Sequence, residues 1–265
     1  MRLSPDALQQ DLIPRLARAH RPALLHITAP EVDAFTADLL GGSDCAMRAR
    51  LDALRQRGFF NEDLCLDLLA PAARKLGTLW DDDRCDFTRV TIGVGHLQRL
   101  MRLLGPNGPP TAVAQAAGLH MLLVRAPHEQ HTFGLTMVAE FFRAAGWSVA
   151  GVSGIGGGAE ATAEERAQVQ HFDAVGFTVS AETQLGWVAA QIKALRRASR
   201  NPHVVVMLGG PLFVLQPQRA AGLDADLCVP AAREAAALAH GRVQQRVQQR
   251  VQQRAQQRVQ TLRAA

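Results

Sequence analysis

The second half of the chain alternates short apolar runs with segments of helical periodicity, and this alternation limits the possible folds more than any other feature. Such runs are typical of strands buried on both faces of a parallel sheet and joined by crossover helices. The predicted strands are residues 119–125, 147–152, 174–180, 204–208 and 226–229. The predicted helices between them are residues 135–145, 161–171, 183–199 and 212–221. Five strands in this pattern predict an α/β domain with a doubly wound parallel sheet.

The first hundred or so residues have a different pattern, with apolar residues at three- and four-residue spacing and no competing strand signal. They predict helices at residues 5–19, 31–40, 45–57, 62–79 and 86–104. The run Gly-Pro-Asn-Gly-Pro-Pro over residues 105–110 can support neither a helix nor a strand. We therefore predict a helical bundle (1–104), a linker (105–117), an α/β domain (118–241) and a helical tail (242–265).

The tail carries the basic character of the chain. The formal net charge is +5, but six arginines and no acidic residue follow Glu234, so the remainder has a net charge of −1. The body therefore has no evident nucleic-acid-binding face, and direct sequence-specific DNA binding is not expected. Val-Gln-Gln-Arg repeats over residues 243–258 predict a solvated, partly frayed extension of the last helix. The alternatives are an arm that docks on an acidic partner or on phosphates, and a repeat expansion without a function.

The sequence lacks the apolar segments that are typical of membrane-spanning and secreted proteins. No apolar stretch reaches the ~18 residues that a membrane span needs, and residues 1–6 lack the apolar core of a signal peptide. The four cysteines form no CxxC pair and are expected to be reduced and structural. We expect a cytoplasmic protein that does not attach to membranes.

The hexapeptide Glu-Gln-His-Thr-Phe-Gly at residues 129–134 stands between the first predicted strand of the sheet and the next helix. The carboxyl end of such a strand is where open α/β sheets place ligands. Glu129 could hold one ring nitrogen of His131 while the other nitrogen binds a metal. Gly134 would let a bulky group approach the backbone. His131 is therefore the candidate metal ligand, and the alternative for the stretch taken alone is a loop histidine with an ordinary hydrogen bond.

Two later strand ends carry matching signals. Ser180 ends the third strand with Thr183 close behind it, and Gly209-Gly210 ends the fourth. In a flavodoxin-like strand order the first, third and fourth strands are neighbours, so their loops line one crevice. A hydroxyl there can bond a ligand nitrogen, and paired glycines leave room for a flat or elongated group.

This set of residues resembles the cobalamin-binding domain of methionine synthase and of corrinoid-dependent mutases. The resemblance implies that His131 binds cobalt from below and that Glu129 supports it. It further implies that the nucleotide tail of the cofactor slides into the sheet. The other residues that it assigns to the cofactor are Gln130, Thr132, Phe133, Gly134, Ser180, Thr183, Gly209 and Gly210. Glu129 replaces the usual aspartate, and the family's Ser-x-Leu segment reads Ser-Ala-Glu here.

The helical half is similar to the cap that precedes cobalamin domains in methionine synthase and in CarH-type photoreceptors. Leu-Gly-Thr-Leu-Trp at residues 76–80 carries this similarity, which implies that Trp80 packs on the upper face of the corrin. A Glu-His pair that those photoreceptors carry falls at Val90 and Thr91, so the upper histidine ligand is missing. Val90 and Thr91 are the residues expected near that face.

The cap and the sheet together resemble the AerR/PpaA family of cobalamin-binding antirepressors. The segment from Gly77 to Phe87, followed by Val-Thr-Ile-Gly-Val-Gly-His-Leu-Gln, carries this resemblance. It implies a light-responsive regulator that is not an enzyme and that binds a repressor of photosynthesis genes of the CrtJ or PpsR type. The expected cofactor is hydroxocobalamin or adenosylcobalamin, with its cobalt.

Other interpretations of the same residues stay open. A corrinoid methyl carrier of a methyltransferase system would share the cap and the sheet, and a flavodoxin-like domain could hold a different ligand. His128 could replace His131 as a ligand, although no carboxylate lies two positions before it. His96, in the helical half, is expected to be structural.

Overall fold

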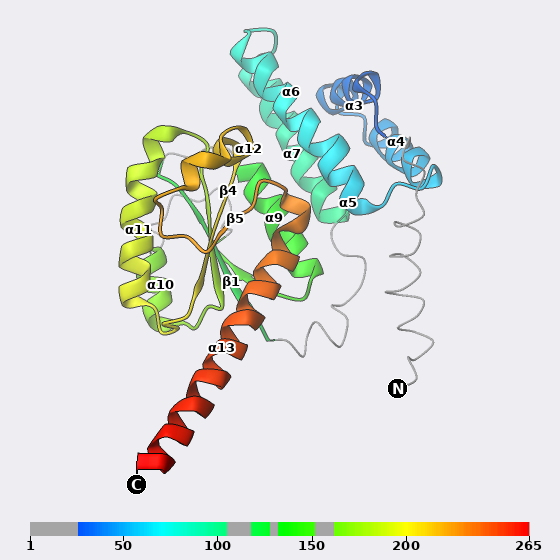
Figure 1. The fold of residues 1–265 in the computed structure, drawn as a ribbon. Helices are drawn as coiled ribbons and strands as arrows, with labels where there is room; N and C mark the ends of the chain where they lie inside the picture. The colour runs from blue at the N-terminus through cyan, green and yellow to red at the C-terminus, as the bar shows by residue number, and fades with distance from the viewer. Residues whose placement is uncertain (1–25, 105–117, 128–131, 152–161, 265) are drawn as a thin grey trace, which may run out of the picture.

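The computed structural model describes residues 26–104, 118–127, 132–151 and 162–264. A helical bundle is followed by a parallel sheet with helices on both faces (Figure 1). The predicted fold class is therefore confirmed. The helix predicted at residues 5–19 and the linker predicted at 105–117 lie outside the described residues.

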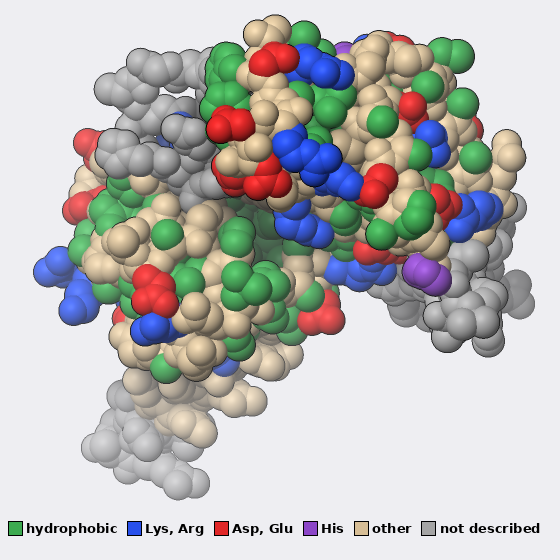
Figure 2. All heavy atoms as spheres, turned by 90° about the horizontal axis from the view of Figure 1, so that it is seen from above, with side chains coloured by type: hydrophobic (Ala, Val, Ile, Leu, Met, Phe, Trp, Pro, Cys, Tyr) green, Lys and Arg blue, Asp and Glu red, His purple; other side chains and the backbone are tan. Residues whose placement is uncertain are grey.

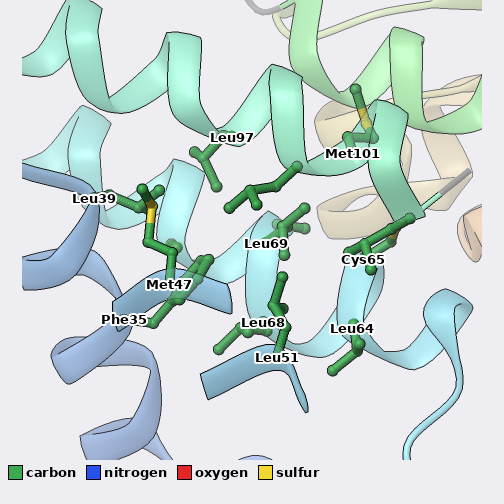
Figure 3. Close-up of a cluster of buried hydrophobic side chains, with 14 of the residues drawn as sticks. Phe35, Leu39, Met47, Leu51, Leu64, Cys65, Leu68, Leu69, Leu97 and Met101 are labelled. Carbon is green, nitrogen blue, oxygen red and sulfur yellow. The ribbon is translucent and has the colours of Figure 1, made fainter. Parts of the chain in front are cut away.

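The bundle is built from amphipathic helices around one apolar core. Its elements are α3 (Ala29–Gly41), α4 (Asp44–Gln56), α5 (Asn61–Asp63), the π-helical turn η2 (Leu64–Leu69), α6 (Ala70–Asp81) and α7 (Phe87–Leu104). At the start of α3 the Thr28 N–H and hydroxyl donate to the Glu31 carboxylate, at 2.7 and 2.8 Å, which satisfies one of the free amide groups there. Phe35, Leu39, Met47, Leu69 and Leu97 meet in the interior (Figure 3).

The segment predicted as one regular helix at residues 62–79 contains the wide turn η2 instead. Pro71 explains the difference, because proline has no N–H to donate to the carbonyl four residues earlier and its ring crowds that carbonyl. The Ala70 N–H accordingly bonds the Cys65 carbonyl, five residues back. A single wide turn lets the helix continue through the proline.

The sheet has five parallel strands in the order β2-β1-β3-β4-β5. Their bounds are β1 (His120–Arg125), β2 (Ser148–Ala150), β3 (Ala174–Thr178), β4 (Val205–Gly209) and β5 (Leu227–Cys228). All five predicted strands are present, most of them a residue or two shorter than predicted. This is the flavodoxin-like order, in which the direction of winding reverses between β1 and β3.

Helices cover both faces of the sheet. On one face lie α10 (Ala163–Val169), η3 (Glu182–Gln184), α11 (Leu185–Ala198), α12 (Pro211–Leu215) and η4 (Pro217–Ala220). On the other face lie α9 (Thr132–Ala144), η5 (Ala232–Glu234) and α13 (Ala235–Ala264). Neighbouring strand residues such as Met121 and Leu122 belong to opposite cores, as expected of strands buried on both sides.

The bundle meets the sheet domain through α9 and η5. Met137 belongs to the bundle core, and Phe133 and Phe141 pack against it. Arg233 of η5 forms an ion pair with Asp63 at 3.2 Å, and this carboxylate also accepts the Phe60 N–H at 2.8 Å. Asp63 is only 2% exposed, so the pairing brings a buried charge and its partner together across the junction.

Helix α13 has 30 residues and crosses the predicted boundary at residue 241 without a break (Figure 1). The first Val-Gln-Gln-Arg repeat, residues 243–246, is not the solvated extension that was predicted, because Val243 is buried and Arg246 pairs with Asp226. Only further along the helix do Val247 and Val251 become exposed. Across the described ranges, none of the helices combines the length and apolarity that crossing a membrane requires.

All four cysteines are free. Cys65 lies in the bundle core beside α9, where burial, and then the carboxylates of Glu140 and Glu62, raise the pKa of its thiol to about 12. A thiol with so high a pKa stays protonated and unreactive at neutral pH. This agrees with a structural role for the buried cysteine.

Candidate functional site

The site begins at the carboxyl ends of three neighbouring strands. Arg125 at the end of β1 is in register with Thr178 of β3, and Thr178 is in register with Gly209 of β4. The predicted site residues that follow these strands therefore begin at the same level, side by side along one edge of the sheet. They lie next to the reversal between β1 and β3, the place where ligands bind in such sheets.

Gly210 brings the loops after β3 and β4 into direct contact. Its φ is 107°, a conformation that side chains rarely allow. A Cβ there would lie 2.6 Å from the backbone nitrogen and oxygen of Val179 and 2.9 Å from Thr178 Oγ1. Gly209 is less constrained, since its Cβ would meet only the Val229 carbonyl oxygen, at 3.5 Å. Two backbone hydrogen bonds, from Val179 N–H to Gly209 O and from Leu212 N–H to Val179 O, hold the loops together.

Ser180 lies beside this contact with an unsatisfied hydroxyl. Its Oγ is buried and has no hydrogen-bond partner among the described residues. Its backbone N–H is already used, because it donates to Gln184 Oε1 at 2.8 Å, and the Ala181 N–H donates to the same oxygen at 3.3 Å. Buried hydroxyls are nearly always paired, so an unpaired one at a strand end indicates a missing partner.

Gln184 and the pair Glu182–Arg219 are site residues that the sequence alone did not indicate. Gln184 caps the turn that carries Ser180, and Arg219 of η4 bonds Glu182 of η3 at 2.7 Å across the two loops. A glutamine four residues after the serine was the available signal. The Glu182–Arg219 ion pair could not be recognised in the sequence, because it joins two loops that are distant in the chain and come together only in the fold. Thr183, predicted near the ligand, lies exposed in η3.

The predicted metal ligand His131, with Glu129 and Gln130, lies outside the described residues, as does the alternative ligand His128. The structure resumes at Thr132, the first residue of α9, whose side chain is also outside the described part. Phe133 is partly buried against the bundle core, and Gly134 is exposed, with no atom within 4 Å of the position that a Cβ would take. The predicted ligand thus directly precedes a helix that the bundle contacts.

The cap residues lie on the hairpin formed by α6 and α7. Trp80 is 46% exposed and packs edge-on against Phe87, which is 68% exposed, with the ring centroids 5.8 Å apart. Thr91 is exposed, whereas Val90 is partly buried against the bundle core. His96 has the structural role predicted for it, since its Nδ1 lies 3.1 Å from the Leu39 carbonyl oxygen.

The tip of this hairpin extends past the carboxyl ends of the strands (Figure 1). Figure 2 looks onto that end of the molecule and shows hydrophobic side chains in a hollow between the bundle and the sheet domain. Trp80 and Phe87 together present exposed aromatic surface on the α6–α7 hairpin, which fits packing against a flat apolar group.

The described donors of the site suit a bulky cofactor. The unpaired Ser180 hydroxyl and the glycine contact at Gly210 leave a polar partner and open backbone at one strand edge. These features fit the serine and glycine positions expected of a cobalamin site.

Comparisons with known proteins agree with this geometry. The model of the family described as "B12 binding domain" matches residues 119–239. An uncharacterized 20.5 kDa protein of the bchF-crtJ intergenic region of Rhodobacter capsulatus is 32% identical over 166 residues, which cover 63% of this chain and 84% of that protein. The monomethylamine corrinoid protein of Methanosarcina barkeri has a similar structure, with a TM-score of 0.58 at 17% identity, over 79% of this chain and 97% of that one.

The structural likeness covers the helical bundle as well as the sheet and establishes the shared fold. The similarity to the Rhodobacter protein is high enough, over enough of its length, to establish common descent. The chain carries a B12-binding domain at residues 119–239 and belongs to the same family as the Rhodobacter capsulatus protein.

Proposed function

We propose that this protein is a light-responsive, cobalamin-binding regulator that relieves repression of photosynthesis genes by binding a repressor of the CrtJ or PpsR type. The observation that carries the proposal is the Rhodobacter relative, which is described by its place between bchF and crtJ, taken together with the B12-binding domain of this chain. The protein would act by contact and would catalyse no reaction itself.

The residues of the site would divide the binding of cobalamin between them. From the sequence pattern, His131 would hold the cobalt with Glu129 supporting its ring, and the Ser180 hydroxyl would bond the nucleotide base. Gly209 and Gly210 would leave room for the tail, and Trp80 would cover the upper face together with Phe87. When bound, cobalamin would supply absorption of visible light and a cobalt ion whose upper ligand can change.

Helix α9 offers a route from the ligand loop to the bundle. It begins at Thr132, directly after the predicted ligand, and its residues Phe133, Met137 and Phe141 contact the bundle core. A shift of the ligand loop would therefore move side chains on which the bundle rests. Light can change the position of the cap only if the two states of the cofactor favour different positions.

Replacing Ser180 by alanine should have opposite effects on stability and on cobalamin binding. Losing a buried hydroxyl that has no partner in the described structure should leave the free energy of unfolding unchanged or raise it by about 1 kcal/mol. Losing its bond to the cofactor should weaken cobalamin binding roughly 5- to 10-fold. Urea unfolding of the cobalamin-free protein and absorbance titration would measure the two effects.

Ser148→Ala is the matched control, because Ser148 is exposed at the amino end of β2, on the opposite edge of the sheet from Ser180, and the same change there should affect neither quantity much. If Ser180→Ala lowered the stability of the cobalamin-free protein and left the affinity unchanged, the hydroxyl would serve the fold and not the cofactor.

The regulatory proposal predicts that the repressor distinguishes dark from illuminated protein. Protein loaded with cobalamin in the dark should differ at least 5-fold from illuminated protein in its affinity for an immobilised CrtJ/PpsR-type repressor, the lower end of typical coupling between two sites. Surface plasmon resonance under controlled light would measure this difference, alongside absorption spectra of the same samples. Equal affinities in the two states, with a spectrum that does respond to light, would contradict the proposal.

A corrinoid methyl carrier is the second candidate, favoured by the extent of the fold shared with the Methanosarcina protein. A carrier would accept a methyl group on its reduced cofactor from a methyltransferase and pass it to a second enzyme. We expect no such transfer from this protein. Its detection, together with no binding to the repressor, would favour the carrier.

A further inference from the structure

A second site lies at the opposite edge of the sheet from Gly209 and Gly210. Pro202 and His203 precede β4 and so mark its amino end, and a cavity of about 230 Å³ opens beside them. The polar side chains that line it are Arg196 of α11, His203, and Arg246, Gln249, Arg250 and Gln253 of α13. Two helices and a loop therefore direct cationic and amide groups into one space.

Two of the arginines are fixed in place by a buried carboxylate. Asp226, with a side chain only 9% exposed, bonds Arg196 at 3.2 Å and also pairs with Arg246. Its second role is to accept the Val206 N–H at 2.8 Å, which ties it to β4. Arg246 further donates to the carbonyls of His203 and Val204 at 2.7 and 2.6 Å. These guanidinium groups are held rigidly at the wall of the cavity.

The cationic charge at this edge exceeds the anionic charge. Within the described residues, the ion pairs of Arg196, Arg242 and Arg246 are all made with Asp226 or its neighbour Asp224. Arg250 adds a fourth cation to the same cavity. Burial lowers the pKa of Arg246, and the charges of Arg196 and Arg242 lower it further against the opposite effect of Asp226. Burial and then the charge of Arg250 lower the pKa of His203. A positive field of this kind favours an anion.

Arg250 supplies the donors that a ligand would use. In the described part of the chain no carboxylate lies within ion-pair distance of Arg250, although its side chain lines the cavity beside the two paired arginines. Gln249 and Gln253 add neutral amide donors from the same helix. Guanidinium groups bind phosphate oxygens in pairs and with a fixed geometry, which makes a phosphoryl group the best match for this set.

We propose that this cavity, hereafter the arginine cavity, binds the phosphoryl groups of a small soluble anion such as pyrophosphate or the diphosphate of a nucleotide. Its volume is roughly that of eight waters at about 30 Å³ each, which is enough for two linked phosphoryl groups and too little for a whole nucleotide. A nucleoside would extend outward along the exposed part of α13. The site is independent of the cobalamin site and of the function proposed above.

Isothermal titration calorimetry of the full-length protein with inorganic pyrophosphate at about 0.15 M salt tests the proposal, since surface charges are largely screened there. We expect one saturable site per chain. Arg250→Gln should weaken it at least 10-fold, because the variant removes guanidinium donors that pair with no carboxylate among the described residues. ADP should bind with the same dependence on Arg250 if the natural ligand is a nucleotide, and weakly or not at all if it is free pyrophosphate.

Arg254→Gln is the matched control. It removes the same charge one turn further along α13, outside the arginine cavity, and should weaken binding by no more than about 2-fold. Absence of saturable binding would overturn the proposal. Equal losses in the two variants would also overturn it, and so would an oligonucleotide that binds tightly and depends equally on both arginines. Equal losses or such oligonucleotide binding would show that α13 attracts any polyanion through its charge alone.

Discussion

Replacing His131 by alanine should abolish the binding of cobalamin and leave the purified protein colourless. His131 stands six residues after β1 and directly before α9, where the carboxyl edge of the sheet presents its ligands. Changes to residues that only support a metal ligand already cost 10- to 100-fold in affinity, so loss of the ligand itself should cost at least about 100-fold. The absorption spectrum after loading and gel filtration would measure the cobalamin retained.

Two further variants make this result specific. His128→Ala removes the other histidine of the same loop and should keep the colour, because no carboxylate stands two positions before it. Glu129→Gln should weaken binding by 10- to 100-fold without removing it. Full retention of cobalamin by His131→Ala would refute the assignment, and loss of colour in His128→Ala alone would move the ligand to that residue.

Gly210→Ala should destabilise the folded protein by about 2–4 kcal/mol, through backbone strain and through overpacking against its neighbours. The positive φ of Gly210 disfavours any side chain, and the new Cβ would stand 2.6 Å from two backbone atoms of Val179. Those atoms also form hydrogen bonds with Gly209 and Leu212, so a shift would strain both loops. The midpoint of urea unfolding would report the loss.

Gly209→Ala is the natural comparison because it adds the same methyl group one residue earlier. Its Cβ would make an ordinary contact at 3.5 Å, and the change in stability should stay below about 1 kcal/mol. Similar losses in both variants would show that the close contact at Gly210 does not set the cost. The well-folded Gly209 variant also allows cobalamin binding to be measured apart from stability.

Much of the fold could be predicted from local sequence, because strands buried on both faces must be apolar throughout. The runs that contain β1, β3 and β4 show this plainly, and the neighbouring positions of Ser180 and Gly209 followed from the strand order. The prediction of one continuous helix at 212–221 was wrong, because the segment forms two short helical elements. Pro217 has no N–H to extend α12, so this helix ends at Leu215 and a separate short turn follows.

What could not be predicted depends on contacts between distant segments. The pairing of Asp226 with arginines of α11 and α13 joins residues that are 20 or more positions apart, and no local spacing indicates it. For the same reason the first Val-Gln-Gln-Arg repeat was assigned to a solvated tail, although Val243 and Arg246 contact the sheet domain. The positions of His131 and Glu129 remain predictions from the sequence.

Because Asp226 anchors α13 to the sheet domain, the number of repeats sets how far the free part of the helix extends. Each four-residue unit lengthens a helix by about 6 Å and turns its arginine by about 40° from the one before. With Arg246 held by the sheet domain, adding or losing a unit beyond Arg250 would change how far the arm reaches and which way its charge faces, and would leave the domain unaltered. A change in the number of repeats can therefore alter the length and direction of the arm without any change in the cofactor domain.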